Sequence, residues 1–220
     1  MKTSIIITSY NYAQYIERCV RSCLNQYHID NTNEIIIVDD CSSDNTLQVL
    51  EKFRRFPNVH IIANKQNVGV AETANIGIRE SVGQFIVRVD ADDYIREEFI
   101  FFLRSYLEVN RDAFGVASDY FLVDEREQVI RRGYSDVEPI SCGIMYRRDL
   151  LVQAGLYNPD FRHMEEAELR HRLGDRYMLL HFRMPLYRYR MHNANKTKSD
   201  DYFVFKAQHH ALVARATDTE

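Results

Sequence analysis

The segment Glu34-Ile35-Ile36-Ile37-Val38-Asp39-Asp40 decides the fold. Its four central residues form an unbroken β-branched run, which is typical of a strand that is covered by other elements on both faces. Two aspartates follow at the point where the apolar run stops. A strand of this kind predicts a parallel sheet packed between two layers of helices, with polar groups where the strand ends.

Short apolar strands alternate with helices on both sides of this segment. We expect strands at Ser4–Ile7, Glu34–Asp39, Val59–Ala63 and Phe85–Val89. We expect helices where Ile16, Val20, Cys23 and Leu24 recur at helical spacing, at Asn45–Phe53 with Asp44 as its N-cap, and at Val70–Glu80. This alternation predicts an α/β fold with a doubly wound, mostly parallel sheet, whose ligands bind beyond the carboxyl ends of the strands.

The pattern changes after Asp93 into shorter, mixed elements. The expected strands are Gly115–Val123, Val129–Arg131 (after a turn at Asp124–Glu127), Ser141–Tyr146, Met178–Leu180 and Leu186–Met191. The expected helices are Glu97–Leu107, Arg148–Ala154, Met164–Leu173 and one within Tyr202–Ala214. No linker or repeat separates the two parts of the sequence. We therefore expect one continuous domain, with residues 1–113 as one half and an α+β subregion, residues 114–220, as the other.

Composition and charge exclude some classes of protein. The 220 residues are 45% hydrophobic and 27% charged, as in ordinary globular domains. The net charge of −4 argues against a nucleic-acid partner. No apolar run approaches the roughly 20 residues that span a bilayer, and the apolar stretch at the N-terminus is too short for a signal peptide. The four cysteines contain no Cys-x-x-Cys pair, which favours reduced thiols. These features predict a cytoplasmic protein.

Polar residues gather where three of the expected strands end: Thr8-Ser9-Tyr10-Asn11, Asp39-Asp40 and Asp90-Ala91-Asp92-Asp93. Asp90 and Asp92 could share a hard divalent cation that bridges two phosphates, although solvated turn residues show the same pattern. Asp39 or Asp40 could accept hydrogen bonds from a nucleobase or ribose. Thr8 and Tyr10 could bond to and stack on a base, with a packing role as the alternative for Tyr10.

Four sequence blocks, in this order and spacing, resemble glycosyltransferase family 2 over residues 3–110. The blocks are Thr3–Asn11, Ile36–Thr46, Asn67–Ala71 with Ala74–Ile78, and Asp90–Asp93. The resemblance implies the GT-A fold and an inverting transfer from a nucleotide diphosphate sugar, with a UDP-sugar as the first choice. It implies a glycan or lipid-linked acceptor, and hence peripheral contact with the inner face of a membrane for enzymes that use lipid-linked glycans.

The resemblance also assigns roles to individual positions. The position matching Asp92 ligates Mn²⁺ or Mg²⁺ on the donor diphosphate, and the position matching Asp90 lies near the ribose and the metal. The positions matching Thr8, Tyr10 and Asp40 hold the base, with Asp39 beside them. His192 matches a late histidine that is a metal ligand in a subset of GT-A enzymes.

The second half matches the family more loosely. Glu165-Glu166-Ala167-Glu168-Leu169 stands where the family has Glu-Asp-x-Asp, whose second acid is the catalytic base. Glu166 is therefore the candidate base, with Glu165 as the alternative. An acidic first helical turn favoured by the helix dipole is the purely structural explanation. A carboxylate base near the acceptor hydroxyl typically contributes ~10²–10⁴-fold to the rate.

Three departures from the family pattern bear on these expectations. Glu166 replaces an aspartate, Thr73 stands where an arginine is common, and the chain has no tryptophan, so Leu169-Arg170-His171 lacks the usual aromatic residue. The departures leave open a degenerate domain that binds a sugar nucleotide or a partner without turnover. A sugar nucleotidyltransferase is disfavoured, because that class has a Gly-rich loop after its first strand. For Tyr202–Ala214 the scarcity of basic residues favours a packed helix over an interfacial one.

Overall fold

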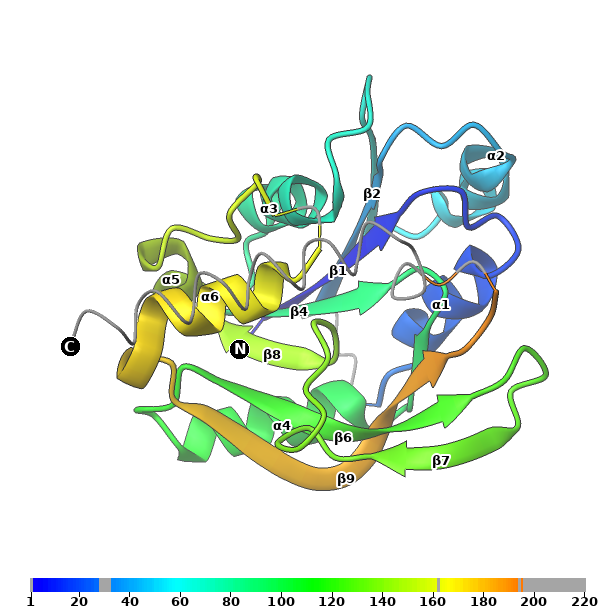
Figure 1. Cartoon of the computed structure of the whole chain (residues 1–220). Helices are drawn as coiled ribbons and strands as arrows, with labels where there is room; N and C mark the ends of the chain where they lie inside the picture. The colour runs from blue at the N-terminus through cyan, green and yellow to red at the C-terminus, as the bar shows by residue number, and fades with distance from the viewer. Residues whose placement is uncertain (1, 28–32, 162, 194, 196–220) are drawn as a thin grey trace.

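A computed structural model describes residues 2–27, 33–161, 163–193 and 195. Within this part of the chain the strands form one curled sheet of nine strands in the order β3-β2-β1-β4-β8-β6-β9-β5, with β7 paired to β6 (Figure 1). The strands are β1 Thr3–Ser9, β2 Asn33–Asp39, β3 Val59–Ala63, β4 Phe85–Asp90, β5 Tyr94–Ile95, β6 Gly115–Val123, β7 Val129–Gly133, β8 Ile144–Arg147 and β9 Leu179–Arg190. The helices are α1 Ile16–Leu24, α2 Thr46–Leu50, α3 Val70–Glu80, α4 Phe99–Val109, α5 Arg148–Gln153 and α6 Glu165–Leu173.

The first half of the chain has the predicted alternation. Strands β3, β2, β1 and β4 are parallel neighbours, joined through α1, α2 and α3. The helix predicted at Asn45–Phe53 is shorter, because α2 ends at Leu50 and continues as a 3₁₀ turn, Glu51–Phe53. The N-cap is Asn45 rather than Asp44. Asp44 stands one residue earlier, and its carboxylate accepts the Thr46 N–H at 2.9 Å.

The second half is mixed, and here two sequence predictions were wrong. The strands predicted at Met178–Leu180 and Leu186–Met191 are one strand, β9, which runs parallel to β6. The register of this pair shifts on either side of Asp119, whose partner is Pro185. Proline donates no backbone hydrogen bond, so an irregular ladder accommodates it without ending the strand.

Smaller differences concern strand limits. The strand predicted at Ser141–Tyr146 is β8 and begins only at Ile144. The two-residue strand β5 was not predicted at all; it pairs with β9 just after the acidic residues that follow β4. The helix predicted within Tyr202–Ala214 lies outside the described residues.

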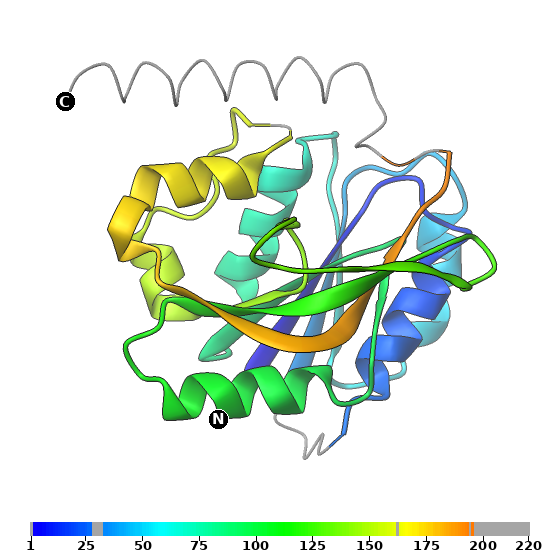
Figure 2. The same cartoon turned by 60° about the horizontal axis from the view of Figure 1, so that its bottom comes forward.

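Helices cover both faces of the sheet, as Figure 2 shows from a second direction. Alternate residues of the central strands point to opposite cores. Ile5 and Ile7 of β1 pack with α1 and α4, whereas Ile6 packs with α3, α5 and α6. Every residue of β1 and β2 is buried. This confirms the prediction that these strands are covered on both sides, and it leaves the strand ends for polar chemistry. In the described part of the chain, none of the helices is long and apolar enough to cross a membrane.

The packing of α3 on the sheet predicts the effect of a one-methyl insertion. A Cβ on Gly77 would lie 2.5 Å from Cγ2 of Ile6 and 3.3 Å from Cγ2 of Val38. Gly→Ala within a helix ordinarily stabilises a protein by up to ~1 kcal/mol. Here we expect Gly77→Ala to destabilise by about 1–3 kcal/mol, because the buried, β-branched Ile6 has little freedom to move. Urea unfolding measures this, with the exposed Glu80→Ala as the control; a Gly77→Ala protein as stable as the wild type would contradict the close contact.

Candidate functional site

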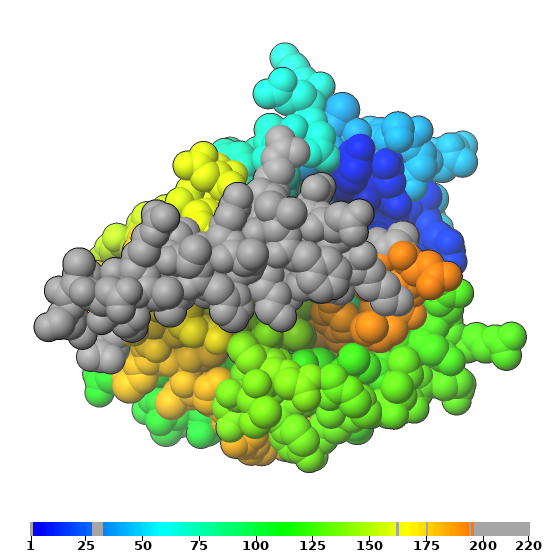
Figure 3. Space-filling model, viewed as in Figure 1, coloured from blue at the N-terminus to red at the C-terminus, as the bar shows by residue number. Residues whose placement is uncertain are grey.

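A cleft of about 280 Å³ opens at the carboxyl ends of the central strands, opposite the N-terminus of α6. Seven of the residues selected from the sequence line it: Thr8, Tyr10, Asp40, Asp90, Asp92, Glu165 and Glu166. Figure 3 shows the molecule as a solid surface from the viewpoint of Figure 1, with the blue and cyan N-terminal segments above and the green and orange later segments below. Residues from both halves of the sequence therefore meet in one cavity.

The acidic loop after β4 is fixed from behind by β9. Asp93 is 2% exposed, and its carboxylate accepts hydrogen bonds from the Arg190 N–H and from the Tyr187 hydroxyl, both at 2.8 Å. Burial, followed by the charges of Asp92 and Asp90, raises the pKa of Asp93 well above its ordinary value. Asp93 is thus a buried anchor of the loop, and Asp90 and Asp92 are left to face the cleft.

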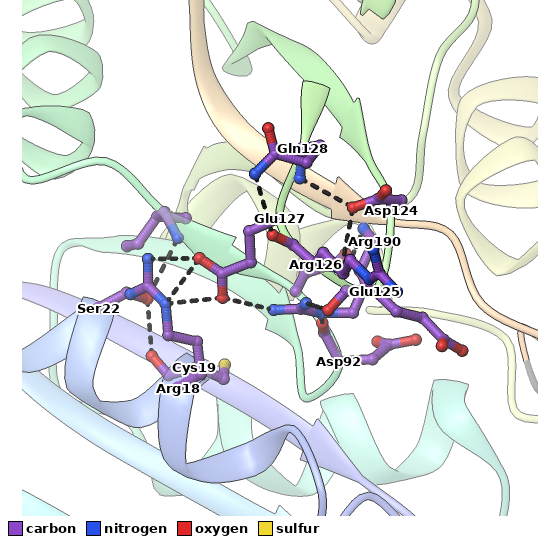
Figure 4. A network of polar contacts seen from close by, with 12 residues as sticks. Arg18, Cys19, Ser22, Asp92, Asp124, Glu125, Arg126, Glu127, Gln128 and Arg190 are labelled. Carbon is purple, nitrogen blue, oxygen red and sulfur yellow. Dashed lines mark hydrogen bonds and ion pairs between the residues drawn. The ribbon is translucent and has the colours of Figure 1, made fainter. Parts of the chain in front are cut away.

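Arg190 belongs to a wider network, drawn in Figure 4, that joins three elements. Its Nε donates to the main-chain carbonyl of Asp92 at 2.8 Å, and its Nη2 to Glu127 at 3.0 Å. Glu127, in the turn between β6 and β7, also accepts hydrogen bonds from Arg18 of α1. Arg190 is 3% exposed, so its charge needs this carboxylate. The network holds the main chain of the acidic loop and leaves the Asp92 side chain available.

Asp92 and His192 lie together although 100 residues separate them in the sequence. Asp92 Oδ2 is 2.9 Å from His192 Nε2, and both residues are buried. The Tyr12 and Tyr15 rings pack on the imidazole, with ring centroids 6.1 and 4.8 Å away. Burial and the charge of Asp92 raise the pKa of the Tyr12 hydroxyl, which keeps it protonated as a hydrogen-bond donor. His192 is not among the cleft-lining residues, so it contacts the site through Asp92.

The residues expected to hold a base differ in how exposed and engaged they are. Tyr10 is 37% exposed at the rim of the cleft. The Thr8 hydroxyl donates to Asp90 Oδ1 at 3.3 Å. Asp40 lines the cleft, and its two oxygens accept hydrogen bonds from Asn64 and from the main chain of Val68 and Gly69, all at 2.9 Å. Asp39 is fully buried outside the cleft lining, where its carboxylate accepts from the N–H and hydroxyl of Ser42.

Two sets of residues can be compared as metal ligands. Among the described residues, potential ligand atoms of Asp90, Asp93 and Cys142 lie within 4.8 Å of one another. Burial raises the pKa of the Cys142 thiol, and the carboxylate of Asp93 is already engaged. A protonated thiol suits neither Mn²⁺ nor Mg²⁺. The carboxylates of Asp90 and Asp92 fit those ions better by their chemistry, and His192, the third expected ligand, lies 2.9 Å from Asp92 Oδ2.

The two acids that begin α6 have different surroundings. Glu165 is 3% exposed, and its Oε1 accepts a hydrogen bond from Arg88 Nη1 at 2.7 Å. Glu166 is 2% exposed; its Oε1 accepts a hydrogen bond from the Tyr177 hydroxyl, whereas its Oε2 has no hydrogen-bond partner among the described residues. Glu165 is therefore a paired charge, and Glu166 has a free oxygen in the wall of the cleft.

Burial changes the proton affinity of Glu166. It raises the pKa of this carboxyl from 4.5 to about 7, although the hydroxyls of Tyr177 and Tyr146 and the charges of Arg170 and Arg88 act in the opposite direction. A carboxyl group with a pKa near neutrality both releases and accepts a proton readily at physiological pH. Glu166 thus has the property that a general base requires.

Several residues of the site were missed in the sequence. Two of them are buried cations: Arg190 binds the acidic loop, and Arg88 binds Glu165 of α6. Three others are tyrosines that donate to the carboxylates of the site or lie beside them, namely Tyr12, Tyr177 and Tyr187. Arg88 had a visible indication, because it interrupts the apolar strand Phe85-Ile86-Val87-Arg88-Val89 just before Asp90. The three tyrosines had none, since tyrosine is common in apolar cores.

Comparison with family models finds a match over most of the chain. The model described as Glycosyl transferase family 2 matches residues 4–211. Among curated proteins, the chain is 36% identical over 99 residues to the poly(ribitol-phosphate) beta-N-acetylglucosaminyltransferase TarS of Staphylococcus aureus (strain Mu50 / ATCC 700699). This match covers 44% of the present chain and 17% of TarS, so the chain spans far less than the whole length of that relative.

Two solved structures share the fold. TarS 1–349 in complex with UDP-GlcNAc matches with a TM-score of 0.78 and 21% identity, over 93% of this chain and 64% of that one. The mannosyltransferase PcManGT from Pyrobaculum calidifontis, in complex with GDP-Man and Mn²⁺, matches with a TM-score of 0.73 and 17% identity, over 97% of this chain and 64% of that one. These likenesses confirm the GT-A fold expected from the sequence.

The raised pKa of Glu166 predicts a pH-dependent effect on stability. A carboxyl group whose pKa is higher in the folded protein contributes stability that is present below about pH 4.5 and lost as the pH rises through about 7. Glutamine does not titrate, so the Glu166→Gln variant does not lose this stability as the pH rises. The difference in free energy of unfolding, variant minus wild type, should therefore be larger at pH 8 than at pH 5, by up to roughly 3 kcal/mol.

Urea unfolding of both proteins at the two pH values measures the difference. Glu17→Gln is the control, because Lys52 and Arg21 lower the pKa of the exposed Glu17 carboxyl, and this variant should gain nothing as the pH rises. An equal difference between Glu166→Gln and wild type at both pH values would show that Glu166 is not perturbed by burial.

Proposed function

The chain belongs to glycosyl transferase family 2, and from this premise we propose that it transfers a sugar from a nucleotide diphosphate sugar to a hydroxyl group of a glycan or lipid-linked acceptor. We propose that the transfer inverts the anomeric centre and uses Mn²⁺ or Mg²⁺. A UDP-sugar is the proposed donor, since TarS, which has the same fold, is found in complex with UDP-GlcNAc.

The observation that supports this proposal best is the meeting of two kinds of carboxylate in one cleft. Asp90 and Asp92 come from the end of β4, and Glu166 comes from the first turn of α6. A transferase needs a group that stabilises the leaving diphosphate and a base that receives the acceptor proton. The cleft has residues suited to both needs.

On the donor side, we propose that Asp92, Asp90 and His192 hold the divalent ion. When bound, such an ion stabilises the negative charge that develops on a leaving diphosphate. The hydrogen bond between Asp92 and His192 orients the Asp92 carboxylate before any ligand arrives. Thr8, Tyr10 and Asp40 are proposed to hold the base, with Tyr10 stacking on it at the rim and Asp39 fixing the turn beneath through Ser42.

On the acceptor side, we propose Glu166 as the general base. In a single displacement the acceptor oxygen attacks the anomeric carbon as the bond between that carbon and the phosphate oxygen breaks. The acceptor proton passes to Glu166 Oε2, and the electron pair of the broken bond leaves with the nucleoside diphosphate. Glu166 Oε2 is suited to this role because it has no hydrogen-bond partner among the described residues. Tyr177 meanwhile holds the other oxygen in place.

The metal assignment predicts the behaviour of Asp92→Asn. The amide keeps the shape of the side chain but loses its charge, so Mn²⁺-dependent binding of UDP should weaken at least tenfold, the loss expected when a metal ligand or its support is removed. Isothermal calorimetry with UDP, with and without Mn²⁺, measures this. Asp112→Asn, at an exposed position between α4 and β6 outside the cleft lining, is the control. Equal Mn²⁺-dependent affinity in Asp92→Asn would remove Asp92 from the ligand set.

The base assignment predicts the behaviour of Glu166→Gln. This variant should bind UDP with Mn²⁺ as the wild type does and lose ~10²–10⁴-fold in kcat, since an amide cannot accept the acceptor proton. Product formation from radiolabelled UDP-GlcNAc and GDP-Man, with a panel of glycan acceptors, measures the transfer. An active Glu166→Gln protein would refute the assignment. Wild-type protein that binds UDP but transfers no sugar would instead identify a binding domain without turnover.

A further inference from the structure

Arg88 lies between the donor side and the acceptor side of the cleft. We propose that it is a positioning residue that ties Asp90 to Glu165, and thereby sets where Glu166 stands in the cleft. The kinetic part of this inference rests on the proposed function, whereas its structural part does not.

The alternation along β4 places Arg88 on the same side of the sheet as α6. Phe85, Val87 and Val89 point into the core beneath α1 and α4, and Ile86 points into the core that contains α6. Arg88, two residues after Ile86, therefore faces α6. Its guanidinium is 4% exposed and lines the cleft. An apolar residue would fill this position in an ordinary buried strand, so a charge here needs a specific partner.

Arg88 has two such partners, one from each side of the cleft. Its Nη1 donates to Glu165 at 2.7 Å, and its Nε lies 3.1 Å from Asp90 Oδ1 without forming a hydrogen bond to it. Burial lowers the pKa of Arg88, but the charges of Asp90 and Glu165 outweigh this and raise it above its ordinary value. The guanidinium stays charged, and its planar fork spans two carboxylates that a single ammonium group could not bridge in the same way.

The first turn of α6 begins at an irregular N-cap, and its two acids are held by Arg88 at Glu165 and by Tyr177 at Glu166. Met164, the N-cap, is in the left-handed region with φ of 62°, and no side chain caps the helix. A non-glycine residue in this conformation is strained and persists only where surrounding contacts enforce it. Upstream, Asn75 of α3 binds the main chain of Tyr157 on both its N–H and its carbonyl. Glu165 is a further fixed point, and its hydrogen bond comes from Arg88.

Glu166 follows Glu165 directly, so the ion pair determines the position of the proposed base. Glu165 Oε1 is engaged by Arg88, which leaves Glu166 as the acid for proton transfer. Arg88 also lies close enough to lower the pKa of Glu166. The other charged or titratable groups that face Glu166 are Tyr146 of β8, Tyr157 of the segment before α6, Arg170 of α6, Tyr177 after it, and Glu165 itself.

Hydrogen exchange tests the structural part without any substrate. In Arg88→Gln the amides of residues 165–169 should exchange at least tenfold faster than in the wild type, while those of β1 should be unchanged. Arg88→Lys should also show faster exchange, because lysine keeps the positive charge but lacks the planar guanidinium that spans two carboxylates. Arg54→Gln, which removes an exposed pair with Glu51 on the surface, is the matched control. If the amides in the first turn of α6 exchanged in Arg88→Gln at the same rate as in the wild type, the proposal would be overturned.

Kinetics separate positioning from a merely structural role. With Mn²⁺ and UDP-GlcNAc, Arg88→Gln should lose on the order of 10–100-fold in kcat, as expected for a displaced catalytic group. The acid limb of its pH profile should move to higher pH, because a positive charge near Glu166 is gone. Glu165→Gln should move that limb to lower pH, and Arg88→Lys should leave it in place.

A pH profile that Arg88→Gln leaves unmoved would overturn the proposal even if kcat fell. If the wild-type protein cleaves no nucleotide sugar, the proposed function fails, and the exchange experiment still decides whether Arg88 positions α6.

Discussion

The central strands are buried on both faces, and this constraint decides where polar groups can stand. Successive residues of β1 point into opposite cores, Ile5 and Ile7 to one and Ile6 to the other, so a charged side chain in the middle of the strand would lie in apolar surroundings. The strand ends are free of this constraint. Because β1, β2 and β4 are parallel and Thr8 pairs with both Val38 and Asp90, the ends lie at one edge of the sheet. The cleft therefore follows from the strand topology.

A cleft built in this way gathers acids, and their mutual repulsion must be offset. Two buried arginines contribute most of the compensation. Arg190 holds the main chain of the acidic loop and is itself neutralised by Glu127, and Arg88 lies between Asp90 and Glu165. Asp93 is handled differently, since burial and neighbouring charges raise its pKa. The side chains of Asp90 and Asp92 both line the cleft, and carboxylate oxygens are the ligands that a hard divalent cation prefers.

The sequence predicted the parallel half of the fold well, because its strands are short apolar runs that end in polar residues. It failed at β9, where Pro185 suggested a break that pairing with β6 bridges. For the site, most of the carboxylates selected from the sequence share the cleft, since they follow strand ends or begin a helix, but Asp39 lies outside its lining. The sequence could not predict that Glu165 binds Arg88 whereas Glu166 binds Tyr177, because both partners come from other elements. Long-range side-chain pairing leaves no local pattern in a sequence.

Two adjacent glutamates in one helical turn thus have different chemistry for reasons outside the helix. The helix dipole favours both as anions to a similar degree. What separates them is that Glu165 accepts a hydrogen bond from a buried cation, whereas Glu166 accepts one from the Tyr177 hydroxyl and has only the partly exposed Arg170 guanidinium 3.9 Å away. Burial destabilises the charged form of Glu166 and raises its pKa to about 7, so this acid changes its protonation state near neutral pH. Glu166 has one methylene more than the aspartate that is usual at this position, and this length is compatible with the role of a base. Its Oε1 accepts a hydrogen bond from the Tyr177 hydroxyl, while its Oε2 has no hydrogen-bond partner among the described residues.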